Sequence, residues 1–378
     1  MFFKKIIILS LFLFVLLGGF VILYDFNDTL KIGIMVPKSG DLISRGNNVL
    51  DVLNLSFTEI NLNSGINGKL VELLVIDSKC SRQGGVDAGE KFVELGVDIV
   101  VGGVCDEAVF GAVDIFNENR ILFISSSSGH SRLTIEDDFI FRNRPSNLVF
   151  IEGIVNIVLR GNHSSVGIIY DSESVGESLI FDIESGLKNG GLEVFTSSFI
   201  LGDDDSINDF IGLVKNENLE SILFLVDSDI NLKYLLSKLE TYNLGLPKYS
   251  NDIILNSNFV FFRDFLEGTK FPSFSYDLEN PKSFYFINKF SKTYSKNIFM
   301  LDTFFNMAVT YDLPFILNKS LEGCDFEKNI SICAKQNLEN FPGYGGVIDN
   351  YSFDKYGDLI YPISDFIYVG GESLLLKN

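Results

Sequence analysis

The sequence predicts an α/β protein with two doubly wound parallel-sheet domains joined by a multi-strand hinge. Three observations support this prediction: apolar runs of strand length recur, amphipathic helical segments alternate with them, and polar stretches interrupt the alternation twice. The apolar runs are continuous, which is typical of parallel strands covered on both faces. The expected strands are Lys31–Pro37, Val71–Asp77, Asp98–Val104, Ile121–Ser126, Val166–Asp171, Leu192–Ser198 and Ser221–Asp227.

Helical periodicity separates these runs and produces repeated βαβ units. The segment Asn47–Asn61 places Leu50, Leu53 and Phe57 on one face, as a helix that packs on a sheet should. Gly85–Leu95 and Glu107–Asn117 show the same pattern, and Asp106 is expected to cap the latter helix. With right-handed crossovers, repeated βαβ units give a doubly wound sheet.

Two breaks in the pattern suggest the domain boundaries. The first is the proline-containing stretch Phe141–Leu148, and the second is Phe271–Asp277. Helical patterns then follow at Lys282–Ser295 and Phe299–Asn318, and Gly345–Gly371 is short, glycine-rich and strand-like. We therefore expect an N-terminal segment of residues 1–27, an N-terminal lobe of residues 28–146 plus 276–348, and a C-terminal lobe of residues 147–275 plus 349–378.

The N-terminal segment has the character of a targeting sequence. Two lysines precede an apolar run from Ile6 to Tyr24, which exceeds the ~7–15 residues of a signal-peptide core and approaches the ~20 that span a bilayer. No small-x-small cleavage site follows this run. We expect residues 6–24 to anchor the chain in the cell membrane, with the lysines inside and the rest outside the cytoplasm. The alternative is a cleaved signal peptide and a secreted protein.

Four cysteines fit an oxidising, extracytoplasmic compartment. Cys80 and Cys105 each follow an expected strand, and neighbouring parallel strands finish at the same edge of a sheet, so these residues can come within disulfide reach. Cys324 and Cys333 would form a second disulfide. The alternative is four buried free thiols. A zinc site is not expected, because His130 lies next to no cysteine pair.

Charge and motifs disfavour several functions. The net charge of −20 argues against nucleic acid or anionic lipid as a partner. No glycine-rich phosphate loop is present, and we expect no cofactor or metal. The stretch Ser125–His130, SSSSGH, allows a serine hydrolase as an alternative. Since no histidine has a triad-like context, we interpret this stretch as a loop that offers hydroxyl and backbone N–H groups to a small ligand, and we expect no catalytic residue.

Taken together, several segments resemble one known family. In chain order, the segments that carry the resemblance are KIGIMVPKSGDL, SGINGKLVELLVID, VVGGVC, ILFISSSS, FIFRNRPSN, IIYDSESVGES and FPGYGGVIDNYSFDKYGDL. They resemble the extracytoplasmic solute-binding proteins of ABC transporters, in the branched-chain amino-acid and amide-binding group with the periplasmic binding protein type I fold. The resemblance covers about residues 31–370.

This resemblance implies ligand contacts at eight positions and places the first disulfide beside the loop that receives the ligand carboxylate. The implied contacts are Arg45 in the first loop, Asp106 after the second cysteine, Ser127, Ser128 and Gly129 after the fourth strand, Val175, Ser228 and the acidic residue Asp252. It also implies that Cys324 and Cys333 form a local staple.

Departures from the family pattern affect the expected ligand. Asp106 replaces the serine that usually binds the ligand carboxylate, and like charges ~4 Å apart cost several kcal/mol at a protein-like dielectric. Val175 and Ser228 stand where aromatic residues are usual. Because Asp252 matches the acid that pairs with the ligand ammonium, the two aspartates favour a ligand with positive charge or several hydrogen-bond donors. Alternatively, Asp106 only caps its helix and points away from the ligand.

The resemblance implies a receptor, expected to be monomeric, that captures a small polar ligand by hinge closure and delivers it to an ABC transporter permease. The alternative within the same fold is a membrane-anchored sensor that does not serve transport.

Overall fold

The computed structural model describes residues 29–40, 42–172, 175, 177–255, 257–301 and 304–376. The predicted anchor at residues 6–24 lies outside these residues. Among the helices described, none is long and apolar enough to cross a membrane. The chain divides into two compact units, Met1–Ile124 with Thr310–Asn340 and Ser125–Val309 with Phe341–Asn378. The lobe boundaries expected from the sequence stay a prediction.

The five-stranded sheet has the order β2-β1-β3-β4-β5, a doubly wound order in which β1 pairs in parallel with both β2 and β3. Its strands are β1 (Leu30–Val36), β2 (Val71–Asp77), β3 (Ile99–Gly102), β4 (Leu122–Ser125) and β5 (Ile140–Arg142). The helices that follow the first three strands are α2 (Ile43–Leu62), α3 (Arg82–Glu94) and α4 (Asp106–Asn119). Two further helices are α11 (Phe304–Ser320) and α12 (Ile330–Glu339). The predicted strands of this sheet are confirmed, and burial of β1, β3 and β4 explains their continuous apolar sequence.

The disulfide between Cys80 and Cys105 is present, with a Cα–Cα distance of 5.4 Å. The expected reason for it was wrong, since β1 lies between β2 and β3 and the two strands are not neighbours. Instead, Cys80 immediately precedes the N-cap of α3, Cys105 is the N-cap of α4, and α3 packs against α4. The disulfide therefore joins the starts of two packed helices.

Asp106 is the first residue of α4 rather than its cap, so that expectation was wrong by one residue. Cys105 takes the cap position because its backbone is still extended (φ −117°, ψ 129°). The carboxylate of Asp106 lies in the first helical turn, where negative charge is favoured by the helix dipole.

The second predicted disulfide is also confirmed. Cys324 and Cys333, in the segment between α11 and the first turns of α12, have a Cα–Cα distance of 5.8 Å. All four cysteines of the chain are therefore paired.

The second unit contains a seven-stranded sheet of order β15-β14-β10-β9-β8-β6-β7. Strands β6, β7 and β8 pair in parallel, as predicted. Strands β9 and β10 continue the parallel part and were not predicted, and β10 occupies the start of Phe271–Asp277, which was expected to be a break. Strands β14 and β15 add an antiparallel edge that the sequence pattern also did not predict. The strands are β6 (Ser165–Asp171), β7 (Glu193–Phe199), β8 (Ile222–Leu225), β9 (Lys248–Ser250), β10 (Lys270–Phe274), β14 (Ile363–Val369) and β15 (Glu372–Leu375).

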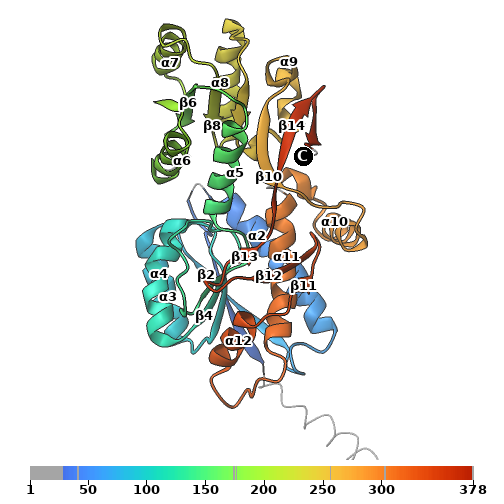
Figure 1. Ribbon diagram of the computed structural model, residues 1–378. Coiled ribbons are helices and arrows are strands. Elements are labelled where there is room, and N and C mark those ends of the chain that lie inside the picture. The colour runs from blue at the N-terminus through green and yellow to red at the C-terminus, as the bar shows by residue number, and fades with distance from the viewer. Residues whose placement is uncertain are drawn as a thin grey trace, which may run out of the picture. The chain divides into compact units, whose positions relative to one another are not determined.

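Helices cover both faces of this sheet and bury two hydrophobic clusters (Figure 1). One cluster contains Ile154 and Ile183 and lies under α5 and α6. The other contains Phe210 and Leu235 and lies under α7 and α8. The helices of this unit are α5 (Asn147–Leu159), α6 (Glu177–Asn189), α7 (Asp204–Asn216), α8 (Asp229–Leu239), α9 (Arg263–Leu266) and α10 (Pro281–Tyr294), with 3₁₀ turns at Glu240–Tyr242, Asp252–Leu255, Ser257–Phe262 and Ile298–Met300.

The strand-like character expected for Gly345–Gly371 is confirmed. Besides β14, this segment forms most of a small antiparallel sheet of order β11-β12-β13. Its strands are β11 (Tyr344–Gly345), β12 (Asn350–Phe353) and β13 (Leu359–Ile360).

The two disulfides close loops of different length, and this difference gives a testable prediction. Their sequence separations are 25 and 9 residues. By loop-closure entropy, replacing both Cys80 and Cys105 by serine lowers the free energy of unfolding by about 3 kcal/mol, and replacing Cys324 and Cys333 costs about 1 kcal/mol less. Urea unfolding of the two double variants measures both values. Equal losses, or a larger loss for the shorter loop, would contradict the prediction.

Candidate functional site

Polar residues gather where the parallel strands of the seven-stranded sheet end. Asp171 closes β6, Asp227 follows β8, and Asn251 and Asp252 follow β9. Since β6, β8 and β9 pair in parallel, their carboxyl ends meet at one edge of the sheet. Ligands of open α/β sheets bind at this edge.

Asp252 carries a perturbed carboxyl group at this edge. It is partly buried at the start of a 3₁₀ turn and accepts a hydrogen bond from the hydroxyl of Ser273 (3.1 Å). Burial, with a smaller contribution from the charge of Asp227, raises the pKa of Asp252 to about 6. The Ser273 hydroxyl and the positive charge of Arg144 oppose this increase. At neutral pH the carboxyl is thus ionised at a cost, which a cationic or hydrogen-bonding ligand would offset.

Neighbouring groups supply both donors and acceptors. The side-chain amide of Asn251 donates to Asp227 Oδ1 (2.9 Å) and to the carbonyl oxygen of Val226 (2.8 Å). Burial raises the pKa of Tyr276, and the charge of Asp252 adds to this effect. The phenol of Tyr276 therefore stays protonated at neutral pH and is a hydrogen-bond donor near the carboxylate of Asp252.

The segment Ser125–His130, called here the serine loop, follows β4. Its four serines are buried. The backbone N–H of Ser128 donates to the hydroxyl of Ser125 (3.1 Å), and the hydroxyls of Ser126 and Ser127 lie 3.4 Å apart. The ring Nδ1 of His130 accepts a hydrogen bond from the backbone N–H of Arg132 (3.2 Å).

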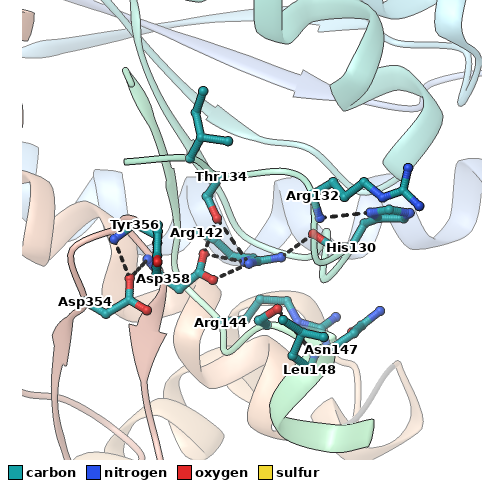
Figure 2. A network of polar contacts seen from close by, with 12 residues as sticks. His130, Arg132, Thr134, Arg142, Arg144, Asn147, Leu148, Asp354, Tyr356 and Asp358 are labelled. Carbon is teal, nitrogen blue, oxygen red and sulfur yellow. Dashed lines mark hydrogen bonds and ion pairs between the residues drawn. The ribbon is translucent and has the colours of Figure 1, made fainter. Parts of the chain in front are cut away.

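Arg144 links the serine loop to the Asp252 region. Its guanidinium donates to the carbonyl oxygen of Ser127 (2.7 Å) and to Asn147 Oδ1 (3.3 Å). The backbone N–H of Asn147 in turn donates to the carbonyl oxygen of Gly129 (2.8 Å). Figure 2 shows Arg144 and Asn147 together at the start of α5. The positive charge that holds the loop is also the one that moderates the pKa of Asp252.

The arrangement suits a small, polar ligand. Two carboxylates, a guanidinium, a phenol and several hydroxyls offer hydrogen bonds in both directions, and the acids favour a ligand that carries an ammonium or amide group. Among the residues that the structure describes, no group of three or more His, Cys, Asp or Glu side chains is placed to hold a metal ion.

The structure places the eight predicted contacts in both units. Arg45 in the first turn of α2 and Asp106 at the start of α4 belong to the first unit, and both are partly buried. The other six belong to the second unit. Within it, Arg144 donates to the carbonyl oxygen of Ser127, its charge lowers the pKa of Asp252, and Asn147 donates to the carbonyl oxygen of Gly129.

Two predicted contacts have structural tasks. Val175 is buried in the hydrophobic cluster under α5 and α6. The hydroxyl of Ser228 caps α8 by accepting a hydrogen bond from the N–H of Asn231 (3.4 Å). Their roles as ligand contacts stay predictions.

Several polar residues at this edge were not predicted from the sequence. They share one signal, since each lies within two residues of the carboxyl end of a strand. The missed residues are Arg144, Asp171, Asp227, Asn251, Ser273 and Tyr276. The spacing of Arg144 from Asp252 in sequence gave no indication that the two charges interact.

Comparison with known proteins agrees with this fold. Residues 29–299 match the family model described as periplasmic binding protein. The leucine-, isoleucine-, valine-, threonine-, and alanine-binding protein of Pseudomonas aeruginosa is 25% identical over 218 residues, which are 57% of this chain and 58% of that protein. The Leu/Ile/Val-binding protein of Escherichia coli K12 is 23% identical over 52% of this chain and 54% of that protein. The match thus spans a little over half the length of these curated relatives.

Solved structures of the same architecture cover nearly the whole chain. An ABC transporter substrate-binding protein from Sphaerobacter thermophilus has a TM-score of 0.77 and 14% identity, over 93% of this chain and 97% of that one. A branched-chain amino acid transporter substrate binding protein from Streptococcus pneumoniae, in complex with isoleucine, has a TM-score of 0.73 and 20% identity, over 93% and 100%. At these identities the similarity establishes the fold.

A methyl group at position 129 tests the packing of the serine loop. A Cβ on Gly129 would lie 2.2 Å from Asn147 Oδ1 and 2.8 Å from Arg144 Cζ. We expect Gly129→Ala to lower the free energy of unfolding by about 1–3 kcal/mol, because the loop or Arg144 must move. The control is Gly212→Ala in α7, where a Cβ meets nothing within 4 Å and should stabilise the helix by about 0.5–1 kcal/mol. Urea unfolding measures the stability of both variants. A Gly129→Ala variant with the wild-type free energy of unfolding would contradict this packing.

The raised pKa of Asp252 predicts a pH-dependent stability. The folded state binds the proton more tightly than the unfolded state, so this group lowers stability as the pH rises from about 4 to about 6. At pH 7, Asp252→Asn should therefore raise the free energy of unfolding by about 1–3 kcal/mol, and the difference should vanish below pH 4. Urea unfolding between pH 4 and 8 measures it. Asp264→Asn, at a carboxylate that is 93% exposed, serves as control. If Asp252→Asn instead stabilised the protein at low pH and not at pH 7, the predicted increase in the pKa of Asp252 would be contradicted.

Proposed function

Because this chain belongs to the periplasmic binding protein family, we propose that it captures a small polar ligand of the amino-acid or amide class for delivery to an ABC transporter. The names of its relatives, which bind branched-chain and other small amino acids, support this class of ligand. Members of the family are binding proteins rather than enzymes. We propose that this chain, too, binds its ligand without a chemical step.

The observation that carries the proposal is the partly buried carboxyl group of Asp252, with Ser273, Tyr276 and Arg144 around it at the carboxyl edge of the sheet. An acid kept in such surroundings costs stability, and ion pairing or hydrogen bonding with a ligand returns that free energy on binding. A ligand ammonium or amide is the complementary group.

The proposed ligand differs from a neutral branched-chain amino acid. Asp252 and Asp227 are both acidic, and Asp106 stands where the family usually has a serine. We propose a ligand with a net positive charge or with several hydrogen-bond donors, such as a basic amino acid or an amide. Arg144 and the serine loop would then bind its carbonyl or carboxylate oxygen atoms.

The proposed mechanism is hinge closure of the lobes 28–146 plus 276–348 and 147–275 plus 349–378. A ligand shifts such an equilibrium only by its differential affinity for the two states. Membership of the family implies an extracytoplasmic location, and the two disulfides fit an oxidising compartment. Attachment to the membrane through residues 6–24, and a monomeric state, are further parts of the proposal.

A ligand screen at several pH values tests the proposal. Thermal shifts of the purified chain would be measured with L-leucine, L-glutamine, L-lysine and L-arginine, since a ligand at 100 times its dissociation constant adds about 2.7 kcal/mol of stability. We expect L-lysine or L-arginine to bind with an affinity that rises as the pH passes through about 6, where Asp252 ionises. Below that pH the affinity should fall up to about tenfold per pH unit.

Two outcomes would contradict the ligand assignment. One is tight binding of L-leucine without binding of the cationic amino acids. The other is pH-independent binding of a cation that survives Asp252→Asn. The exposed-site variant Asp264→Asn, which should bind like the wild type, is the matched control.

A further inference from the structure

A buried ion pair lies directly behind the serine loop. The guanidinium of Arg142 has no exposed surface, and its Nε and Nη2 donate to the two carboxylate oxygens of Asp358, with an Nε–Oδ1 distance of 2.9 Å. Thr134 completes the group, because its hydroxyl donates to Asp358 Oδ1 (2.7 Å). Figure 2 shows Arg142 between Asp358 and the serine loop. A charge buried this deeply persists only where its partners are fixed.

Both partners of the ion pair are held by their own backbone. The N–H of Arg142 donates to the carbonyl oxygen of Gly357 (2.8 Å), and the N–H of Asp358 donates to Asp354 Oδ1 (3.0 Å). Gly357 has φ +84°, and a Cβ there would lie 2.8 Å from the carbonyl oxygen of Ile140. The turn from Asp354 to Asp358 therefore presents its carboxylate to Arg142 in one position.

The third guanidinium nitrogen of Arg142, Nη1, binds the serine loop. Its Nη1 donates to the carbonyl oxygen of His130 (2.7 Å), the last residue of that loop. The neighbouring carbonyls of Ser127 and Gly129 accept from Arg144 and Asn147. Three carbonyls of the loop are thus held by three donors from the short segment 142–147, and the Arg142 donor is itself fixed by the carboxylate of Asp358.

We propose that Arg142 and Asp358 are positioning residues for ligand recognition, whose ion pair holds the serine loop in the conformation that binds ligand. This inference rests on the proposed function, because it assigns the serine loop to the ligand site. Neither residue needs to touch the ligand. Without the pair, the loop keeps its sequence and its local contacts but loses its fixed end at His130.

The test separates positioning from stability. Replacing one partner leaves a buried unpaired charge and destabilises the fold, whereas replacing both by apolar residues of similar size is often neutral or stabilising. The variant is therefore Arg142→Met with Asp358→Leu. Its matched control is Arg160→Met with Asp365→Leu, at another arginine–aspartate pair of the same unit that joins segments similarly distant in sequence.

Hydrogen–deuterium exchange on the ligand-free chains measures the loop directly. We expect peptides covering residues 126–130 to exchange at least about tenfold faster in the Arg142/Asp358 variant and at the wild-type rate in the control. Wild-type exchange in both would overturn the proposal. This readout needs no ligand, so it decides the inference even if none of the tested amino acids binds.

Affinity gives the second readout, measured by calorimetry with L-lysine and L-leucine at a temperature well below unfolding. If the binding conformation of the loop falls to about a tenth of the population, the apparent dissociation constant rises about tenfold. A variant with wild-type affinity would overturn the proposal, while absence of binding by the wild type would instead count against the proposed function. Thr134→Val, which removes only the hydroxyl that donates to Asp358, provides a milder variant with a smaller expected change in the same direction.

Discussion

Parallel strands end at a common edge, and the chemistry of this protein depends on that constraint. In the second unit it brings Asp171, Asp227 and Asp252 to the carboxyl ends of β6, β8 and β9, although the chain separates them by whole βα units. Helices bury both faces of the sheet, so the polar residues that follow the strands concentrate at this edge. The fold thus forms a polar site that no local sequence motif indicates.

Ionisation of Asp252 at this site costs free energy, and neighbouring groups reduce that cost. Burial raises the pKa of Asp252, and repulsion by the charge of Asp227 adds to the increase. Arg144 offsets part of this cost while its guanidinium also holds the carbonyl of Ser127. A ligand that brings positive charge or donors would relieve the remainder, which links the instability of the empty site to affinity for the ligand.

The fold was largely predictable because strand and helix periodicities are local properties. The first four expected strands, the start of the second sheet and both disulfides match the structure. The strand order was not predictable from these patterns. Cys80 and Cys105 meet through the packing of α3 and α4, with β1 inserted between their strands, and β14 joins the sheet in antiparallel orientation. Pairing order depends on contacts between distant segments, which periodicity does not encode.

By itself, the sequence determined the two-period α/β pattern, the oxidising compartment implied by four cysteines, and the serine loop and Asp252 as polar positions after strands. Only the tertiary structure decided which charges face one another. Arg142 and Asp358 lie 216 residues apart in sequence. The charge of Arg144 acts on Asp252 although four strands and four α-helices separate them along the chain. Electrostatic interactions depend on distance in space and on burial, and neither is defined until the chain has folded.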